Sequence, residues 1–224
     1  MTEFDSYSSN YRDLVTESVR ASGEPSEYFA AYKAKYLKRK LGTTGILSVL
    51  DFGCGVGALS EQIKLEMPEA RIDGFDPSQE SLDRVSSRLQ AQGMFSRDLD
   101  LLPGSYDLIV IANVLHHVAP GGRPRVIRCA FEKLKLGGRL VVFEHNPFNP
   151  LTRWAVSQCP FDDDAILLKS REVRKLLLNT GLQRLQRDFI VFFPRPLTFL
   201  RSFEGELARV PFGAQYACIG TRTA

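Results

Sequence analysis

Short apolar runs alternate with longer amphipathic stretches through the middle of the 224-residue chain. The runs have the length of buried strands, and the stretches between them carry apolar residues at helical spacing. Glycine, proline and small polar residues separate the two kinds of segment. The pattern predicts strands at 46–50, 71–76, 93–96, 106–113 and 139–144, with helices at 58–66, 78–90 and 124–136. Such alternation is typical of a parallel sheet with helices on both faces, here a Rossmann-like, doubly wound α/β fold.

The ends of the chain follow a different pattern. The first 44 residues predict two helices, 11–20 and 27–41, which we interpret as an N-terminal helical cap, 1–44. The remaining residues, 45–224, form one α/β domain in which 146–170 is an insertion on the substrate side. The tail predicts helices at 151–157, 169–179 and 197–207, a loop at 159–165, and strands at 182–193 and 215–221.

Composition limits the classes of partner. The formal net charge is +3, from 29 Lys and Arg against 26 Asp and Glu. This charge is mild and dispersed, so we expect no nucleic-acid partner. The four cysteines are far apart in sequence, which argues against a zinc site or a disulfide framework. We find no secretion signal and no apolar run of membrane-spanning length, and we expect a soluble, cytoplasmic monomer or homodimer.

One glycine-rich stretch follows the first predicted strand. Residues 50–58 read L-D-F-G-C-G-V-G-A. Gly53, Gly55 and Ala58 satisfy the G-x-G-x-x-G/A pattern of dinucleotide sites, so a nucleotide cofactor is one interpretation. Asp51 beside the loop would repel a pyrophosphate and would attract a cation. The glycines alone do not decide between these two ligands.

Polar residues follow the predicted strands. In a parallel sheet the carboxyl ends of the strands meet at one edge, and ligands bind there. All three histidines of the chain fall at predicted strand ends: His116, His117 and His145. The acids and amides at these ends are Asp51, Asp76, Asp98, Asn113 and Glu144. This placement predicts a ligand site at that edge.

Five motifs together resemble a known family. They are D-F-G-C-G-V-G from Asp51, G-F-D-P-S from Gly74, D-L-D-L-L-P from Asp98, Y-D-L-I-V-I-A-N-V-L-H-H-V from Tyr106 and L-K-L-G-G-R-L-V-V-F-E from Leu134. In this order and spacing they resemble class I S-adenosylmethionine (SAM)-dependent methyltransferases. The similarity is to the small-molecule branch that includes ubiquinone and menaquinone biosynthesis enzymes. The resemblance implies a seven-stranded, mostly parallel sheet whose last strand is antiparallel, with SAM as cofactor and S-adenosyl-L-homocysteine as product.

The resemblance also implies the roles of single residues. The cofactor would contact the glycine loop, the acid after each of the first three strands, and the segment after the fourth. Its ligands would be Asp51, Gly53, Gly55, Asp76, Pro77, Asp98, Leu99, Asn113 and Leu115, with Tyr11 closing over it. The acceptor would contact Tyr28, Tyr32, Asn149 and Arg153. Three of the acids have structural alternatives, namely Asp51 as a strand-end residue, Asp76 as a helix cap and Asp98 as a turn residue.

Methyl transfer from a sulfonium is an in-line displacement that depends largely on orientation. A base is needed only when the acceptor loses a proton, and His145 and His117 are the candidates. We expect a small-molecule acceptor, methylated on O, N or C and related to sugar or secondary metabolism. We assign no metal ligand, and we interpret Asp162, Asp163 and Asp164 as solvated acids. An NAD(P)-dependent oxidoreductase and a non-catalytic SAM-binding protein stay open as alternatives.

Overall fold

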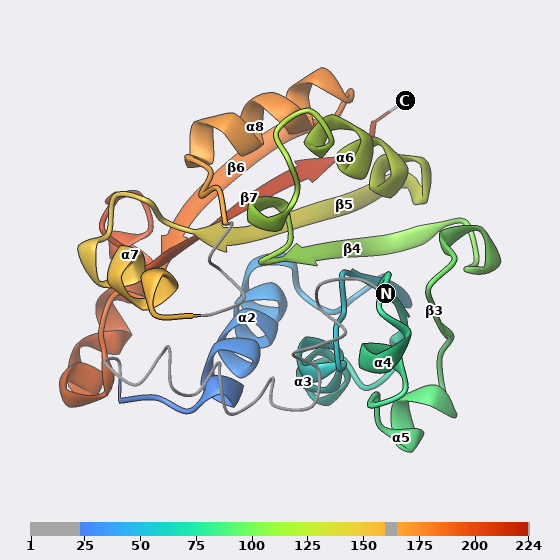
Figure 1. The fold of residues 1–224 in the computed structure, drawn as a ribbon, viewed down its shortest axis with the longest axis horizontal. Helices are drawn as coiled ribbons and strands as arrows, with labels where there is room; N and C mark the ends of the chain where they lie inside the picture. Colours follow the sequence, from blue (N-terminus) through green and yellow to red (C-terminus); the bar gives the residue numbers. More distant parts are fainter. Residues whose placement is uncertain (1–22, 160–164, 224) are drawn as a thin grey trace.

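Seven strands form one sheet in the computed structural model, which describes residues 23–159 and 165–223. The strand order is β3-β2-β1-β4-β5-β7-β6. Figure 1 labels β4, β5, β7 and β6 side by side. All neighbours are parallel except β7, which is antiparallel to both β5 and β6. The strands are β1 Ser48–Phe52, β2 Arg71–Phe75, β3 Phe95–Ser96, β4 Tyr106–Ala112, β5 Leu134–His145, β6 Gln183–Ile190 and β7 Gln215–Thr221. The predicted fold class, including the antiparallel tail strand, is confirmed.

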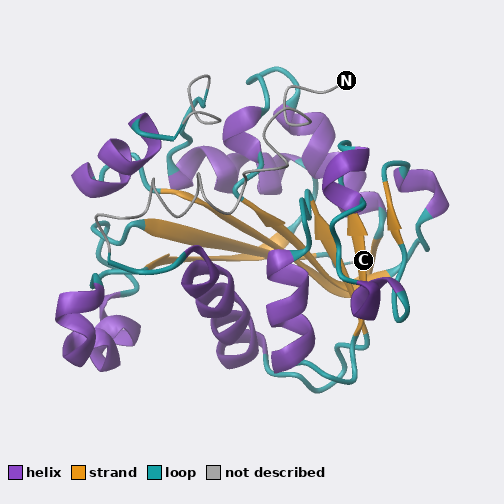
Figure 2. Cartoon of the chain, turned by 60° about the horizontal axis from the view of Figure 1, so that its bottom comes forward, coloured by secondary structure: helices purple, strands orange, loops and turns teal. Residues whose placement is uncertain are grey.

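Helices cover both faces of the sheet (Figure 2). α2 and α3 lie on one face, and α6 and α8 lie on the other (Figure 1). The α-helices are α2 Ser26–Leu41, α3 Ala58–Glu66, α4 Gln79–Leu82, α5 Ser87–Gln90, α6 Arg123–Glu132, α7 Pro150–Ser157, α8 Ser170–Asn179 and α9 Glu204–Leu207. Three 3₁₀ segments, η4 Leu99–Leu101, η5 Leu115–His117 and η7 Arg195–Phe203, complete the described elements.

The core has two layers, one on each side of the sheet. Leu37 of α2 and Ile63 of α3 are fully buried against one face, and Ile127 of α6 and Leu177 of α8 against the other. Burying such a side chain contributes about 1.5–3 kcal/mol. β1 and β4 lie between the layers, which explains why apolar residues face both sides of these strands, with Asp51 and Asp107 as the acidic exceptions. The 1–44 and 45–224 division stays a prediction, but α2 itself is part of the layer that contains α3.

The order of the strands determines where a ligand can bind. From β1 the chain continues outward to β2 and β3, and from β4 it continues in the opposite direction to β5. β1 and β4 are direct neighbours, so the sheet reverses its direction of growth between them. A crevice opens outside the carboxyl ends of two such strands. This is where the glycine loop and Asn113 lie.

Several predicted boundaries are wrong for local reasons. The helix predicted at 124–136 ends at Glu132, because Leu134 already pairs with Tyr106 at the start of β5. The helix predicted at 78–90 is divided into α4 and α5. Ser86 caps the N-terminus of α5, because its side chain accepts a hydrogen bond from the Leu89 N–H. The strand predicted to extend to 193 ends at Ile190, and Val191 has a left-handed φ of 60°. The helix predicted at 11–20 lies outside the described residues.

Candidate functional site

The glycine loop after β1 presents bare backbone to open space. Gly53 and Gly55 have φ angles of +84° and +53°, which side-chain-bearing residues rarely adopt. A Cβ on Gly53 would approach Val114 Cγ2 to 2.4 Å, so the loop packs closely against the segment after β4. A Cβ on Gly55 would meet nothing within 4 Å. The loop is therefore tight on one side and accessible to a ligand on the other.

Asp51 is a buried carboxylate beside this loop. Its side chain is on the α3 face of β1, where Ser60 Oγ donates a hydrogen bond of 2.7 Å to Oδ2. Burial raises the pKa of Asp51 to about 6, and the charge of Asp76 adds to the increase, while Ser60 and Lys33 oppose it. A carboxylate that burial destabilises in its charged form gains when a cation binds next to it.

Asp76 connects the end of β2 to the loop. Its Oδ2 accepts from the Gly55 N–H at 2.8 Å, and its Oδ1 accepts from the Ser78 N–H at 2.9 Å. The cap of α4 is Ser78 and not Asp76. A carboxylate accepts up to about four hydrogen bonds, so Asp76 is a suitable kind of residue to bind hydroxyls. The geometry suits the predicted ribose role, which stays a prediction.

Asn113 lies at the carboxyl end of β4 with a left-handed φ of 56°. Its Oδ1 is buried and has no hydrogen-bond partner within the described residues. An unsatisfied buried carbonyl costs roughly 1–3 kcal/mol. The neighbouring N–H groups are satisfied, because Glu144 Oε1 accepts from Leu115 N at 2.7 Å and from Val114 N at 3.2 Å. The orphaned oxygen is therefore an acceptor available to a cationic ligand.

The three histidines form a cluster at the same edge. The centroid of the His116 ring lies 4.1 Å from the centroid of the His117 ring and 5.2 Å from that of the His145 ring. His116 is only 2% exposed, and its Nδ1 lies 2.6 Å from Glu144 Oε2. Burial raises the pKa of Glu144, but His116, His145 and the Leu115 N–H outweigh it and hold that pKa below the usual value. The ionised Glu144 therefore orients His116, and the half-buried His117 and His145 lie beside that pair.

Four residues of this region were missed by the sequence-based assignment: Lys33, Ser60, His116 and Glu144. Glu144 had been noted only as a strand-end acid, and His116 only as one of a pair. Lys33 belongs to the basic run K-A-K-Y-L-K-R-K at 33–40, whose charge favours a solvated helix face when the sequence is taken alone. Its spacing from Tyr36 and Leu37, three and four residues on, is the signal that places it on the buried face.

The other predicted cofactor residues lie in varied environments. Leu115 is fully buried in the core, and Leu99 packs against the same core cluster. Asp98 is exposed and caps η4, because its side chain accepts a hydrogen bond of 2.9 Å from the Asp100 N–H. This contact fits the structural alternative in which Asp98 is a turn residue. Pro77 is exposed at the start of the α4 segment. Tyr11 lies outside the described residues, and all these assignments stay predictions.

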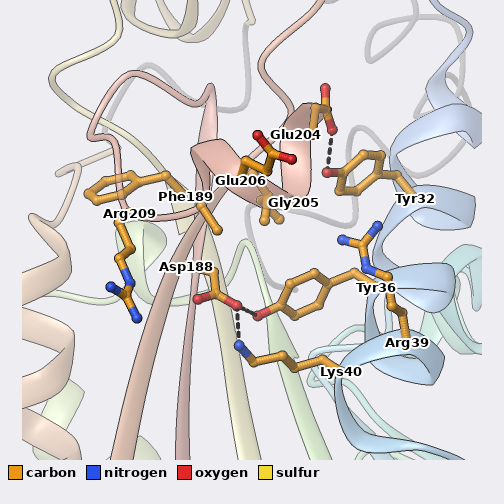
Figure 3. A pocket seen from close by; sticks show the side chains of 12 residues that line it. Tyr32, Tyr36, Arg39, Lys40, Asp188, Phe189, Glu204, Gly205, Glu206 and Arg209 are labelled. Atoms are coloured by element: carbon orange, nitrogen blue, oxygen red, sulfur yellow. Dashed lines mark hydrogen bonds and ion pairs between the residues drawn. The ribbon is translucent and has the colours of Figure 1, made fainter. Parts of the chain in front are cut away.

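Two of the predicted acceptor residues lie on α2, against the segment between β6 and β7. Tyr32 donates a 2.5 Å hydrogen bond to Glu204 of α9. The Arg201 guanidinium lies 4.5 Å from the ring centre of Tyr28. Figure 3 shows Tyr32 at the rim of a cleft of about 490 Å³ that also contains Tyr36, bonded to Asp188 at 2.7 Å. Asp51, Asp76 and Asn113 do not line this cleft, so the structure does not bring Tyr32 together with them there.

The other two predicted acceptor residues lie on or next to α7. Asn149 caps α7 by accepting from the Thr152 N–H at 3.0 Å, and it donates to Phe212 O at 2.7 Å. Arg153 is exposed on the same helix. Asn149 therefore has a structural role that explains its presence without an acceptor, while Arg153 is accessible. Both acceptor assignments stay predictions.

Residues 23–159 and 165–223 contain no group of three His, Cys, Asp or Glu side chains placed to bind a metal ion. Asp162, Asp163 and Asp164 lie outside these ranges. Across the same described ranges, each helix is too short or too polar to cross a bilayer.

A family profile described as "Methyltransferase domain" matches residues 50–140. Ribosomal RNA small subunit methyltransferase C of Pseudomonas entomophila is 29% identical over 127 residues, which cover 52% of this chain and 38% of that protein. The same enzyme of Pseudomonas putida (strain W619) is 26% identical over 133 residues, or 55% and 40% of the two chains. The chain thus spans about two fifths of the length of these curated relatives.

Solved structures share the fold over nearly the whole chain. A SAM-dependent methyltransferase from Archaeoglobus fulgidus superposes with a TM-score of 0.63 at 17% identity, covering 86% of this chain and 94% of that one. Magnesium protoporphyrin IX methyltransferase from Synechocystis PCC 6803, solved with S-adenosylhomocysteine, gives 0.60 at 20% identity, covering 92% and 86%. A possible histamine N-methyltransferase from Thermotoga maritima gives 0.65 at 17% identity, covering 98% of both.

One prediction requires correction. We expected a small-molecule partner and excluded nucleic acid because the net charge is only +3. The curated relatives named for ribosomal RNA contradict that exclusion. The exclusion fails because net charge is a sum over the whole chain, whereas nucleic acid contacts only one local surface. The last turn of α2 alone contains Lys38, Arg39 and Lys40.

Proposed function

We propose that the chain contains a class I SAM-dependent methyltransferase domain and transfers the methyl group to an acceptor held beside His117 and His145. The match of the methyltransferase domain profile to residues 50–140 supports the predicted family, enzyme class and cofactor. The solved methyltransferases support the fold. The observation that carries the proposal is the set of acceptors at one crevice. Asp51 supplies a buried carboxylate on β1, and Asn113 supplies an orphaned amide oxygen at the carboxyl end of the neighbouring β4.

These residues fit the chemistry of the cofactor. SAM supplies a methyl group already activated on a sulfonium, and it carries an ammonium and a ribose diol. Asp51 and Asn113 Oδ1 would hold the cationic end, and Asp76 would accept from the ribose hydroxyls. Gly55 would let the backbone approach the ligand closely. A dinucleotide fits less well, because its pyrophosphate would face the buried Asp51 carboxylate.

The histidine cluster would serve the acceptor. Because Glu144 accepts from His116 Nδ1, the orientation of the His116 ring is fixed. His117 and His145 would take a proton from an acceptor hydroxyl, amine or acidic carbon during transfer. An acceptor that has no proton to lose would need only orientation from them.

Two classes of acceptor have separate support. The ribosomal RNA enzymes among the sequence relatives favour an RNA acceptor. A small molecule, the acceptor expected from the sequence resemblance, has support from the similarity in fold to enzymes named for magnesium protoporphyrin IX and phosphoethanolamine. The structural likeness, at 20% identity or less, concerns the fold alone.

One experiment addresses both classes. The protein is incubated with methyl-labelled SAM and either total RNA or a small-molecule extract, and label incorporation is measured in each. Incorporation into one pool identifies the acceptor class and supports methyl transfer. Binding of the cofactor without incorporation into either pool would contradict methyl transfer and favour a non-catalytic SAM-binding protein. Asp76→Ala serves as the control that loses cofactor binding.

A further inference from the structure

A buried arginine begins α6. Arg123 is only 7% exposed, whereas arginine in general is almost never fully buried unless its charge is paired. It is also the first residue of its helix, where the helix dipole disfavours a positive charge. Arg125, two residues further along the same helix, is exposed in the ordinary way. The burial of Arg123 at this place therefore requires a separate explanation.

Backbone carbonyls hold the Arg123 guanidinium. Its Nε donates to Leu115 O at 3.0 Å and to Val118 O at 2.9 Å. Its Nη2 donates to Ile166 O at 2.8 Å. The planar guanidinium presents its N–H groups in fixed directions, so one side chain can bridge two segments of backbone. Arg123 thus connects the segment after β4 to a segment more than 40 residues further along the chain.

The first of these segments contains the adjacent histidines. Leu115 and Val118 enclose the histidine pair that ends with His117. Glu144 holds the N–H side of this segment, because its carboxylate accepts from the Leu115 N–H at 2.7 Å. Arg123 holds the carbonyl side of the same segment through two hydrogen bonds. The backbone that carries His117 is therefore fixed from both sides.

The second segment lies near the end of the insertion predicted on the substrate side, 146–170. Ile166 N donates to His116 O at 2.9 Å, so this segment also bonds directly to the histidine segment. Two residues further on, Leu168 O accepts from Tyr216 Oη at 2.8 Å, which anchors the segment to β7. The guanidinium therefore lies at the point where the histidine segment meets the insertion.

We propose that Arg123 is a positioning residue for methyl transfer, which holds His117 towards the acceptor by fixing the histidine segment to the insertion. The inference rests on the proposed function, and in this role Arg123 touches neither cofactor nor acceptor. A base must lie within about 2.6–3.2 Å of the group whose proton it takes. A displacement of about 1 Å at a reacting centre can reduce the rate by about 100-fold. Arg123 therefore acts on the rate of transfer and not on cofactor binding.

A double-mutant cycle separates positioning from a general structural role. The rate of methyl incorporation from labelled SAM is measured at saturating concentration of the pool, total RNA or small-molecule extract, that wild type labels. The proteins are wild type, Arg123→Lys, His117→Ala and the double variant, with the exposed Arg125→Lys as the matched control. Lysine keeps the charge of Arg123 but has no planar fork to bridge two segments. Calorimetry with S-adenosylhomocysteine measures cofactor binding in each protein.

We expect Arg123→Lys to lower the rate by roughly 10- to 100-fold, because His117 is displaced. Its affinity for S-adenosylhomocysteine should stay within about twofold of wild type, and Arg125→Lys should behave as wild type. If Arg123 acts through His117, the double variant should be no slower than His117→Ala, because two residues that act as one unit are not additive.

Every other outcome overturns a claim. A wild-type rate in Arg123→Lys, or losses that multiply in the double variant, would overturn the inference. Loss of S-adenosylhomocysteine affinity in parallel with the rate would make Arg123 a residue of the general fold and would overturn it as well. A wild-type rate in His117→Ala leaves nothing to position, so the inference fails while methyl transfer stands. If wild type binds S-adenosylhomocysteine and labels neither pool, the proposed function itself fails.

Discussion

At the residue scale, the buried Asp51 carboxylate lowers stability at neutral pH, as expected of a residue that binds a cation. Burial raises the pKa of Asp51 from its ordinary value of 3.8 to about 6. A group whose folded-state pKa is raised contributes stability below its unfolded pKa and loses that contribution as the pH rises through the folded value. At neutral pH the ionised Asp51 therefore destabilises the unliganded protein. The gain from this residue comes when a cation binds.

Replacement of Asp51 should separate stability from binding. Asp51→Asn keeps an acceptor for Ser60 and removes the buried charge, so the free energy of unfolding at pH 7.5 should increase by on the order of 2 kcal/mol. Affinity for S-adenosylhomocysteine should fall at least about tenfold. Chemical denaturation and calorimetry measure the two quantities. A variant that is less stable and still binds would contradict this account of Asp51.

The pH dependence of binding tests the same residue. A bound ammonium lowers the pKa of Asp51 from its value of about 6 in the free protein. The affinity for the ligand is therefore highest above pH 6, and it declines as the pH falls towards the lower pKa of Asp51 in the complex. Ser60, Asp76 and Lys33 are the groups that also act on this carboxyl. We expect weaker binding of S-adenosylhomocysteine at pH 5 than at pH 7.5 in wild type, and a smaller change in Asp51→Asn. An identical pH profile in both proteins would show that another group titrates.

Glu144 offers a test of the histidine cluster. In Glu144→Gln the amide replaces the ion pair with His116, while an amide oxygen can still accept from the Leu115 N–H. Breaking a buried ion pair costs about 3–5 kcal/mol when one partner is removed outright, so the isosteric amide should cost less. We expect kcat to fall at least about tenfold, with the pH optimum displaced, while the affinity for S-adenosylhomocysteine changes little. Unchanged kcat would assign Glu144 a purely structural role.

At the scale of elements, the glycine loop requires glycine for two separable reasons. Gly53 needs a left-handed φ of +84° and also lies against Val114, whereas Gly45 has a similar φ of +77° with nothing within 4 Å of its Cβ position. Gly45→Ala should cost about 1 kcal/mol from backbone strain alone. Gly53→Ala adds the collision with Val114 and should cost about 2–4 kcal/mol. Equal losses in thermal denaturation would show that packing under Val114 contributes nothing.

The boundaries of helices and strands were predictable where local sequence signals marked them. They were not predictable where hydrogen bonding between strands determined them. The helix at 58–66 and the strand at 215–221 match the structure residue for residue, since glycines and polar residues enclose both. The residues 134–136 follow a helical pattern and still form the start of β5, because Tyr106 pairs with Leu134 across the sheet. Local propensity cannot anticipate such a partner 28 residues away in the chain.

At the scale of the whole molecule, the sheet and its ligand edge were predictable because both follow from strand order. The histidines at strand ends, His116, His117 and His145, were expected at one edge, and the structure brings them together. Contacts of the tail with α2 were not predictable. Tyr32 and Glu204 are 172 residues apart, and only the folded tail places them together. The partner was misjudged for the same reason, since surface charge depends on which side chains the fold assembles.

The central claim is that the crevice outside β1, β2 and β4 binds SAM. Calorimetric titration of S-adenosylhomocysteine into wild type and Asp76→Ala, with NADH as the competing ligand, tests it most directly. The structure predicts micromolar binding of S-adenosylhomocysteine to wild type, loss of at least about tenfold in the variant, and no comparable binding of NADH. Preference for NADH, or no binding of S-adenosylhomocysteine, would contradict the claim. Preference for NADH would also favour a dinucleotide as the ligand of the glycine loop.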